Sequence, residues 1–390
     1  MSIDINGYSF DSGSIFFWDD NPQFVMFPGL LERCVPVDYA LNKLRPDGRV
    51  SNYPFSLEEF FSYGLLSLPR IFTSLLISKW RSRKIRTAKE FMEYYVGRYF
   101  NIISGLENYV RRFYNLDPAL IGSDFASARM GWIRDNGSFR RAPRNVWLRL
   151  FPSRQREHTQ AQTVVRPRAG FADYYGFMTD ALGASGVRFQ FGRELQSIKR
   201  VGDIFEVRAG DQSFLAHHIT STIPVDIVLK LAGLRAFPGL NSSRLITLCC
   251  SFVGKCKSSS IVLYNFDKQG VWKRLTVHSN SYGEVRGAQY MSIECLCTPE
   301  LFDVNQLFSD FVSHVNSRKI FQGEINLEYA FELDYSYPIY TVTSQKEREL
   351  ALSTLREFGI NSVGRQGGFK YIPHSTLIID SIRRWRRTLA

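Results

Sequence analysis

The residues with the clearest capacity for chemistry lie near the end of the chain, in the stretch VGRQGGFKYIPHSTLIIDS. Gly364, Gly367 and Gly368 carry no Cβ atom, so backbone amides in this turn can approach a phosphate or a planar ring closely. Arg365 can donate two hydrogen bonds to one phosphate. A helix expected to begin near Ser375 would add amides and a partial positive charge. Taken alone, the pattern is typical of an ordinary tight turn, and an anion-binding turn is the alternative.

The distribution of charge favours an anionic partner. The chain has 49 Lys and Arg against 37 Asp and Glu, a net charge of +12, with basic clusters at 79–89, 134–156 and 383–387. Such clusters attract nucleic acid, anionic lipid or a phosphorylated substrate. For the first cluster we expect a solvated basic surface. Because no zinc-finger spacing, RNP-like aromatic motif or helix-turn-helix is recognisable, we expect no nucleic acid partner. A diphosphate-bearing substrate would use the same positive field.

Neither metal binding nor histidine catalysis is indicated. The six cysteines form no C-x-x-C pair, and Cys249, Cys250, Cys295 and Cys297 lie in strand-like apolar runs. We therefore expect buried free thiols, no disulfide and no metal site. The six histidines are scattered and supply no obvious general base, and only His374 lies in the glycine-rich segment.

The chain is long enough for two packed units, with 390 residues of which 44% are apolar. No stretch reaches the roughly 18 to 20 apolar residues of a membrane span, because the run at 68–80 is broken by Arg70 and by short polar residues. The N-terminus lacks the basic start and apolar core of a signal peptide. We therefore expect a cytoplasmic protein with no membrane span.

The elements that would position these residues alternate in type. Residues 56–130 have helical spacing, and the pairs Ser56 with Glu59 and Thr87 with Glu90 match a capping box. A polar, basic excursion at 134–165 follows. Further helices are expected at 171–183, at 299–315 and at the C-terminus. Strands are expected at 4–10, 187–192, 195–201, 204–209, 217–224, 244–254, 259–266, 271–279, 288–297, 325–333 and 360–363.

This order predicts a mixed α/β fold with a discontinuous plan. The helical block and the second, strand-rich part are each inserted between pieces of the first α/β unit. We expect residues 1–30, 163–230 and 341–390 to form one domain, and residues 31–162 and 231–340 to form another.

In their order along the chain, these segments resemble a group of flavoproteins. The group comprises UDP-galactopyranose mutase and the protoporphyrinogen-oxidase-like and amine-oxidase-like FAD enzymes. The strand and turn that reach the flavin in these proteins resemble NGYSFDSGSIFF. Their Gly-led helix and strand resemble RPRAGFADYYGFMTDALGASGVRFQFGRELQSI. Their segment that meets flavin and pyrophosphate resembles VGRQGGFKYIPHSTLIIDS. The resemblance implies that the first domain is a Rossmann-like FAD-binding domain. The second domain, a helical insert with an antiparallel sheet, would then bind the substrate.

The resemblance also implies roles for individual residues. Cofactor contacts would come from Gly13, Ser14, Leu195, Gly364, Arg365, Gly368, His374 and Ser375. Arg274 stands where the mutases carry an arginine that binds the substrate diphosphate and stabilises the flavin, with a surface strand position as the alternative. Tyr371 is a candidate contact to substrate or phosphate. Tyr335, Tyr337 and Tyr340 resemble a segment at the edge of the active site, although aromatic residues there are equally compatible with packing.

The chain departs from the family pattern at several places. Ile15, beside Ser14, stands where the family usually carries a histidine facing the flavin, and Pro373 follows Phe369 and Tyr371 where the mutases have an acidic residue. The chain also contains no G-x-G-x-x-G, the turn that binds the pyrophosphate in this family. Losing that turn removes several charge-assisted hydrogen bonds of roughly 1.5 to 3 kcal/mol each. We therefore expect no strong FAD binding by this chain alone.

Three explanations for the missing unit stay open: an upstream start, a second polypeptide that supplies the unit, or a degenerate relative that no longer binds FAD. The sequence predicts an FAD-dependent oxidoreductase of the amine-oxidase and protoporphyrinogen-oxidase-like superfamily, acting on a small phosphorylated or nucleotide-sugar substrate. A sugar ring isomerase that uses reduced flavin, like UDP-galactopyranose mutase, is one alternative. The other is a non-catalytic remnant or a subunit of a split enzyme.

Overall fold

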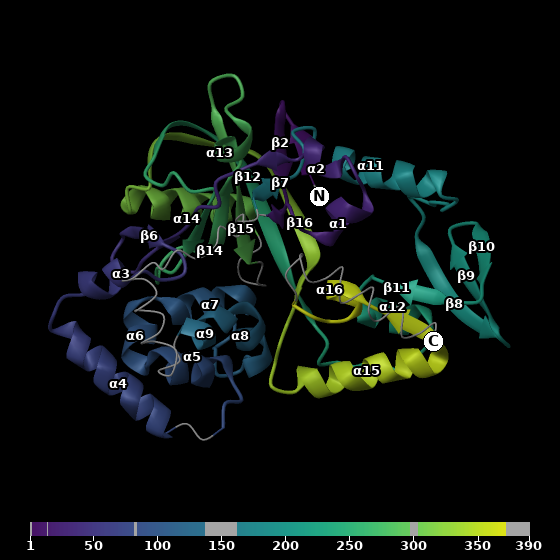
Figure 1. Ribbon diagram of the computed structural model, residues 1–390, viewed down its shortest axis with the longest axis horizontal. Coiled ribbons are helices and arrows are strands. Elements are labelled where there is room, and N and C mark those ends of the chain that lie inside the picture. The colour runs from purple at the N-terminus through teal and green to yellow at the C-terminus, as the bar shows by residue number, and fades with distance from the viewer. Residues whose placement is uncertain (1, 14, 82–83, 137–161, 297–302, 372–390) are drawn as a thin grey trace.

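The computed structural model describes residues 2–13, 15–81, 84–136, 162–296 and 303–371. Figure 1 shows three neighbouring groups of elements: a large sheet with helix α14, a block of helices from α3 to α9, and a group around β8 to β11 with α15. The expected Ser375 helix cap, His374, Ser14 and most of the basic stretch 134–156 lie outside the described residues.

A seven-stranded sheet lies at the centre of the first group, and its strands pair antiparallel except for the parallel pair β13 and β5. In spatial order the strands are β16 (Phe321–Pro338), β12 (Ser242–Cys256), β15 (Gln289–Leu296), β14 (Trp272–Val277), β13 (Val262–Asn265), β5 (Leu41–Leu44) and β6 (Val50–Asn52). The strands predicted within 244–333 are therefore confirmed. They form the second, antiparallel sheet that the sequence predicts.

Alternate residues of β12 face two different cores, because successive side chains of a strand point to opposite faces of the sheet. Leu248 and Phe252 pack with Leu307 and Phe311 of α14 (Val304–Ser317). Leu245 faces the helical block on the other side. The sheet is thus covered on both faces, and the cavity described below lies on the side of the helical block.

The helical block is made of short helices separated by glycines. Gly97 and Gly105 have φ angles of +81° and +75°, and two of these helices end early there. Gly105 also lies close to the large sheet, because a Cβ atom at this position would be 2.0 Å from the carbonyl oxygen of Phe266. The helices are α3 (Leu57–Ser62), α4 (Ser67–Arg81), α5 (Ala88–Val96), α6 (Arg98–Ile103), α7 (Leu106–Tyr114), α8 (Ser123–Arg129) and α9 (Gly131–Asn136). The predicted helical region is confirmed, but it is divided more finely than its periodicity indicates.

The third group combines a small antiparallel sheet with a two-stranded parallel one. Strands β10 (Gln212–Ala216), β9 (Ile204–Ala209) and β8 (Leu195–Val201) form the first sheet, and β11 (Ile219–Ser221) with β17 (Ile360–Ser362) forms the second. Helices α11 (Phe171–Ala184), α12 (Val225–Leu231), α15 (Ser344–Phe358) and α16 (Gly364–Gly367) belong to this group. Helix α15 matches none of the helices predicted from the sequence.

Two local predictions are wrong. Residues 4–10 form a hairpin of β1 (Ser2–Ile5) and β2 (Tyr8–Asp11) rather than one strand, because Asn6 and Gly7 both take positive φ and make the tight turn that Asn-Gly favours. Residues 187–192 form no strand; Phe189 and Phe191 stack on each other at 5.5 Å.

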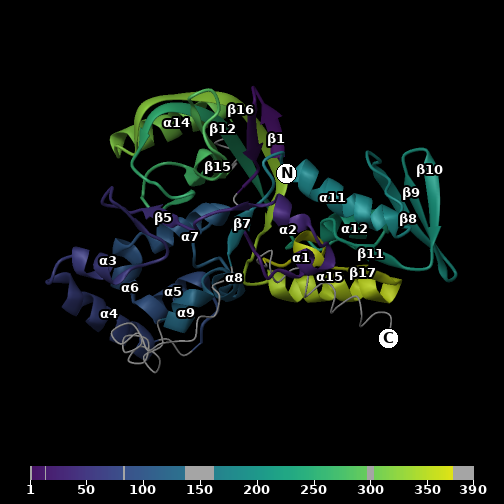
Figure 2. The same ribbon diagram turned by 45° about the horizontal axis from the view of Figure 1, so that its top comes forward.

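Short elements join the hairpin to the rest of the molecule. Strands β3 (Phe17–Trp18), β7 (Thr163–Val165) and β4 (Val35–Pro36) form a three-stranded sheet. Helices α1 (Pro22–Met26) and α2 (Leu30–Arg33) lie beside it, and α13 (Ser279–Tyr282) follows β14. Figure 2 shows this region between the large sheet and the third group.

Cysteine burial agrees with the prediction, since Cys34, Cys249, Cys250 and Cys295 are free and buried, and Cys256 is free and half-buried. Within the described ranges no three His, Cys, Asp or Glu residues gather as a metal site. No helix in that part of the chain is long and apolar enough to cross a membrane.

Candidate functional site

A cavity of about 630 Å³ lies between the large sheet, the helical block and the glycine-rich turn. Four predicted site residues line it: Gly13, Arg274, Arg365 and Tyr371. They come from the N-terminal hairpin loop, from β14, from α16 and from the end of the described chain. The fold thus brings together residues that the sequence places far apart.

Arg274 reaches the cavity because β14 contains a β-bulge. The pairing of β14 with β15 shifts register between Trp272 and Arg274, so the extra residue Lys273 interrupts the alternation of side chains. Trp272 points to the opposite face, where its Nε1 donates to His314 Nδ1 at 2.9 Å. Lys273 and Arg274 both contact Glu294, although neighbouring residues of a regular strand would face opposite sides.

Glu294 holds two cations in this buried cluster. The Nζ atom of Lys273 lies 2.8 Å from Glu294 Oε2, and both Nε and Nη2 of Arg274 bind Oε1 of the same carboxylate. Burial raises the pKa of Glu294, but the Arg274 and Lys273 charges outweigh it and hold that pKa below its usual value. Burial lowers the pKa of Lys273 despite the carboxylate. Arg274 is therefore a fixed, buried cation, and a surface strand position is excluded.

Arg129, at the end of α8, is a second cation of the cavity, and the sequence pattern assigns it no role. Its guanidinium lies 5.7 to 5.9 Å from the ring centroids of Tyr53, Tyr109, Phe113 and Tyr264. Its Nη2 donates to Tyr109 Oη at 2.7 Å, whereas its buried Nε has no hydrogen-bond partner. Among the described residues no carboxylate pairs with it. Within the described part of the chain, Arg129 thus presents a positive charge to the cavity that no carboxylate compensates.

Tyrosine hydroxyls complete this wall. Tyr264 lines the cavity next to Arg129 and Arg274; burial raises its pKa, but the two guanidinium charges outweigh burial and lower it. The Tyr337 hydroxyl lies 3.5 Å from Arg274 Nη2, and the Tyr371 ring packs 5.5 Å from the Tyr337 ring. The wall therefore offers fixed cations and hydroxyls together, the groups that bind phosphate oxygens.

Comparison with known proteins gives a fold and no closer relative. No protein-family model matches the chain, and no curated protein matches it by sequence. Among solved structures, reduced UDP-galactopyranose mutase matches with a TM-score of 0.75 and 17% identity, over 100% of this chain and 86% of that one. A structure assigned as a protoporphyrinogen oxidase from Exiguobacterium sp. 255-15 matches with a TM-score of 0.68 and 13% identity, over 99% and 90% of the two chains.

A putrescine oxidase variant matches with a TM-score of 0.57 and 9% identity, over 99% of this chain and 90% of that chain. The fold resembles that of the FAD-dependent amine-oxidase-like flavoproteins. The resemblance found in the sequence is therefore confirmed at the level of the fold, across the whole chain.

The glycines of the site allow close packing within the protein. A Cβ on Gly13 would lie 2.9 Å from Arg274 Nη2 and 3.0 Å from Glu294 Oε1, so only glycine lets this loop close over the ion pair. A Cβ on Gly367 would lie 2.8 Å from the Ser221 carbonyl oxygen, and one on Gly368 would lie 2.6 Å from that of Gly364. These glycines hold the Arg365 turn against the end of β11, and that turn places Arg365 in the cavity.

The other predicted site residues lie apart or cannot be placed. Leu195 begins β8 and is exposed on the small antiparallel sheet, outside the cavity. Ser14, His374 and Ser375 lie outside the described residues. Tyr335 lines the cavity, whereas Tyr340 is buried behind it and donates to the Phe369 carbonyl oxygen.

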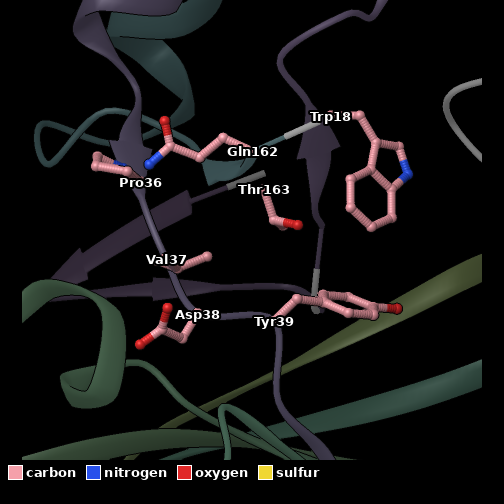
Figure 3. A pocket seen from close by; sticks show the side chains of 7 residues that line it. All are labelled: Trp18, Pro36, Val37, Asp38, Tyr39, Gln162 and Thr163. Atoms are coloured by element: carbon pink, nitrogen blue, oxygen red, sulfur yellow. The ribbon is translucent and has the colours of Figure 1, made fainter. Parts of the chain in front are cut away.

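A second cavity, of about 910 Å³, adjoins the first and shares Trp18 and Tyr39 with it. Figure 3 shows these two aromatic side chains on one side of the cavity, with Val37, Asp38 and Thr163 around the rest. Their ring centroids are 5.5 Å apart, and each side chain remains partly exposed. The boundary between the cavities is therefore aromatic, which suits a flat ring system.

The histidines of the described chain do not line the cationic cavity. His278 lies in a buried cluster behind it, where Nε2 is 2.6 Å from Ser292 Oγ and Nδ1 is 4.0 Å from Asp11 Oδ2. Arg166 Nε binds the same aspartate at 2.7 Å. This cluster fastens the N-terminal hairpin to β15, and it supplies no general base to the cavity.

His278 gives the fold a specific sensitivity to acid. Burial lowers its pKa to about 4, so the folded protein binds fewer protons than the unfolded chain between pH 6.5 and about 4. Stability is then complete above pH 6.5 and is lost as the pH falls through this window, by about 2 kcal/mol at pH 5. We expect the free energy of unfolding, measured by chemical denaturation, to differ less between pH 7 and pH 5 in the His278→Gln variant than in the unchanged protein. Equal differences in the two proteins would contradict this assignment.

Proposed function

We propose that this chain carries the substrate cavity, and the flavin-ring side of the cofactor site, of an FAD-dependent oxidoreductase. Its substrate bears a phosphate or diphosphate, as a nucleotide sugar does. The observation that carries this proposal is Arg129, a guanidinium that pairs with no carboxylate of the described residues and lies in a cavity that also contains Arg274 and Arg365. In the fold of these flavoproteins, such a cavity adjoins the expected place of the flavin.

The charge of the cavity separates phosphorylated substrates from amines. A protonated amine would meet three arginines, Arg129, Arg274 and Arg365, and like charges at close range disfavour binding. The carboxylate of Asp334 also lines the cavity, but it already pairs with Arg244. A diphosphate would instead neutralise the uncompensated guanidinium and could accept from two arginines at once. The substrate class that the site supports best is therefore anionic, in spite of the likeness to an amine oxidase fold.

The described residues fit the ring end of FAD and not its adenosine end. Trp18, Tyr39 and Phe16 supply aromatic walls, and Gly13 and Arg365 lie at the same cavity. Bound FAD would supply hydride acceptance from a C–H bond next to nitrogen or oxygen. The chain's own part would be to hold the phosphates with Arg129 and Arg274 and to exclude water with its aromatic walls.

The adenosine end requires a unit that the described residues do not contain. Strands β11 and β17 form a parallel sheet of only two strands, so each of them has an edge without a partner in this part of the chain. Parallel sheets are normally larger and covered on both faces. A strand, glycine-rich turn and helix added at this sheet would complete the proposed FAD-binding domain, made of residues 1–30, 163–230 and 341–390. A longer form of the chain or a second polypeptide could supply that unit.

A sugar ring isomerisation with reduced flavin is the second candidate. The presence of Arg274, Tyr371 and Arg129 in one cavity favours it, because these groups suit the diphosphate of a nucleotide sugar. Ile15 and Pro373 count against it, since they replace the histidine and the acidic residue of the mutase pattern. Hydride transfer to oxidised flavin would consume an acceptor such as oxygen, whereas isomerisation would leave the redox state of the substrate unchanged.

The proposal is tested in two steps with the purified chain. Calorimetry with UDP should show binding that is lost at high salt, because the contacts are ionic. Titration with FAD should show weak binding, and gel filtration should remove the bound FAD. Turnover of UDP-galactopyranose after reduction would identify the isomerase, and oxygen consumption with a nucleotide sugar would identify the oxidase. A folded protein that binds neither UDP nor FAD would refute the proposal and favour the non-catalytic alternative.

A further inference from the structure

The outer surface of the helical block exposes several large apolar side chains on α3, on α4 and between the two helices. We call it the α3–α4 patch; its members are Phe61, Leu65, Leu66, Phe72, Leu76, Ile77 and Trp80. Trp80 is 84% exposed, and Leu65 and Leu66 are 78% and 90% exposed. Figures 1 and 2 both show α3 and α4 at the outer edge of the molecule. A large exposed apolar surface indicates a binding site rather than ordinary surface variation.

Helix α4 is held firmly by its opposite face, so the exposed face is not a consequence of loose packing. Ile71 is buried, and Ser74 Oγ accepts from the Tyr99 N–H at 2.9 Å. A Cβ on Gly97 would lie 2.9 Å from the Leu75 backbone nitrogen, so α4 approaches α5 and α6 closely. Phe72, Leu76 and Trp80, at intervals of four residues, share the outward side.

Basic residues flank this apolar face on both sides. At 100° per residue, Lys79 lies beside Phe72 on one flank, and Arg70 and Arg81 lie on the other. Between Tyr63 and Lys89 the sequence contains no Asp or Glu. An outward apolar stripe with cations along its flanks is the arrangement of helices that lie in the plane of a membrane surface, because long basic side chains reach the lipid phosphates from there.

We propose that the α3–α4 patch docks this protein on an anionic membrane surface, with α4 parallel to the bilayer plane. The apolar side chains enter the boundary between headgroups and acyl chains, and Arg70, Lys79 and Arg81 pair with anionic headgroups. The absence of acidic residues from α4 favours lipid over a second copy of the chain, because two α4 faces brought together would oppose like charges. This docking requires no membrane-spanning helix, and it is independent of the proposed enzyme activity.

The test is co-sedimentation of the purified chain with phosphatidylcholine vesicles, with and without phosphatidylglycerol. We expect binding to the vesicles that contain phosphatidylglycerol, and a blue shift of fluorescence that is lost in Trp80→Phe. Leu76→Ser with Trp80→Ser should lower the partition coefficient about tenfold or more. The partition coefficient on the anionic vesicles should fall about hundredfold in the triple variant Arg70→Gln, Lys79→Gln and Arg81→Gln.

The matched control is Val201→Ser with Leu215→Ser, which removes two side chains that are 69% and 74% exposed on the small antiparallel sheet. This variant should bind vesicles as the unchanged protein does, and circular dichroism should show that every variant is folded. No vesicle binding, equal binding to both kinds of vesicle, or equal loss in the control would overturn the proposal. So would a dimer in sedimentation velocity that Leu76→Ser with Trp80→Ser abolishes, because the patch would then bind a second copy.

Discussion

Replacing Glu294 by glutamine is expected to lower the free energy of unfolding by about 3 to 5 kcal/mol. The carboxylate is buried and contacts both Lys273 and Arg274, so its removal leaves two buried cations without a counter-charge. Guanidinium chloride unfolding followed by circular dichroism measures the change. The matched control is Glu332→Gln on strand β16 of the same sheet, where the glutamate pairs with Arg244 at the surface.

The control variant should change stability by less than about 1 kcal/mol, because exposed ion pairs contribute little. A loss below about 1 kcal/mol in Glu294→Gln would show that Lys273 and Arg274 are not held as buried cations in solution. That result would also weaken the assignment of Arg274 as a preorganised phosphate ligand.

Replacing Arg129 by methionine is expected to have the opposite profile: a large loss of ligand affinity with little loss of stability. Affinity for UDP should fall about hundredfold, since an arginine that neutralises a buried phosphate contributes several kcal/mol. The free energy of unfolding should change by less than about 1 kcal/mol, because Arg129 pairs with no carboxylate in the described structure and methionine fills a similar volume. Calorimetry and denaturant unfolding on one preparation measure both quantities.

The control for this prediction is Arg111→Met on α7. Arg111 is half exposed and pairs with Glu107 and Asp117 at the surface, away from the cavity. Its replacement should leave UDP affinity unchanged. Unchanged affinity in Arg129→Met would refute the phosphate-binding role, whereas a large loss of stability there would assign Arg129 to the core of the helical block.

The two helix starts with a capping-box spacing show how far local sequence determines structure. Thr87 and Glu90 form the complete reciprocal pair at the start of α5, as predicted. At the start of α3, Ser56 accepts from the Glu59 N–H, but the Glu59 carboxylate pairs with Lys43 of β5 at 2.8 Å. The position where the helix begins depends on neighbouring residues, so the sequence predicts it correctly. The partner of the Glu59 carboxylate lies on a strand that only folding brings near, so the sequence does not predict it.

The sequence by itself determined the helical region, most of the strands and the order of segments, because periodicity, caps and turn residues act over a few neighbouring positions. It also placed Gly13, Arg274, Arg365 and Tyr371 among the candidate site residues. Glu294 carries no local signal, and Arg129, the final arginine of a helical stretch that resembles the family pattern, is assigned no role by the sequence. Only the tertiary structure decided that a bulge turns Arg274 toward Glu294 and that aromatic rings surround the Arg129 guanidinium, which no carboxylate among the residues placed by the structure neutralises. These features depend on contacts between residues distant in sequence, and no local pattern records such contacts.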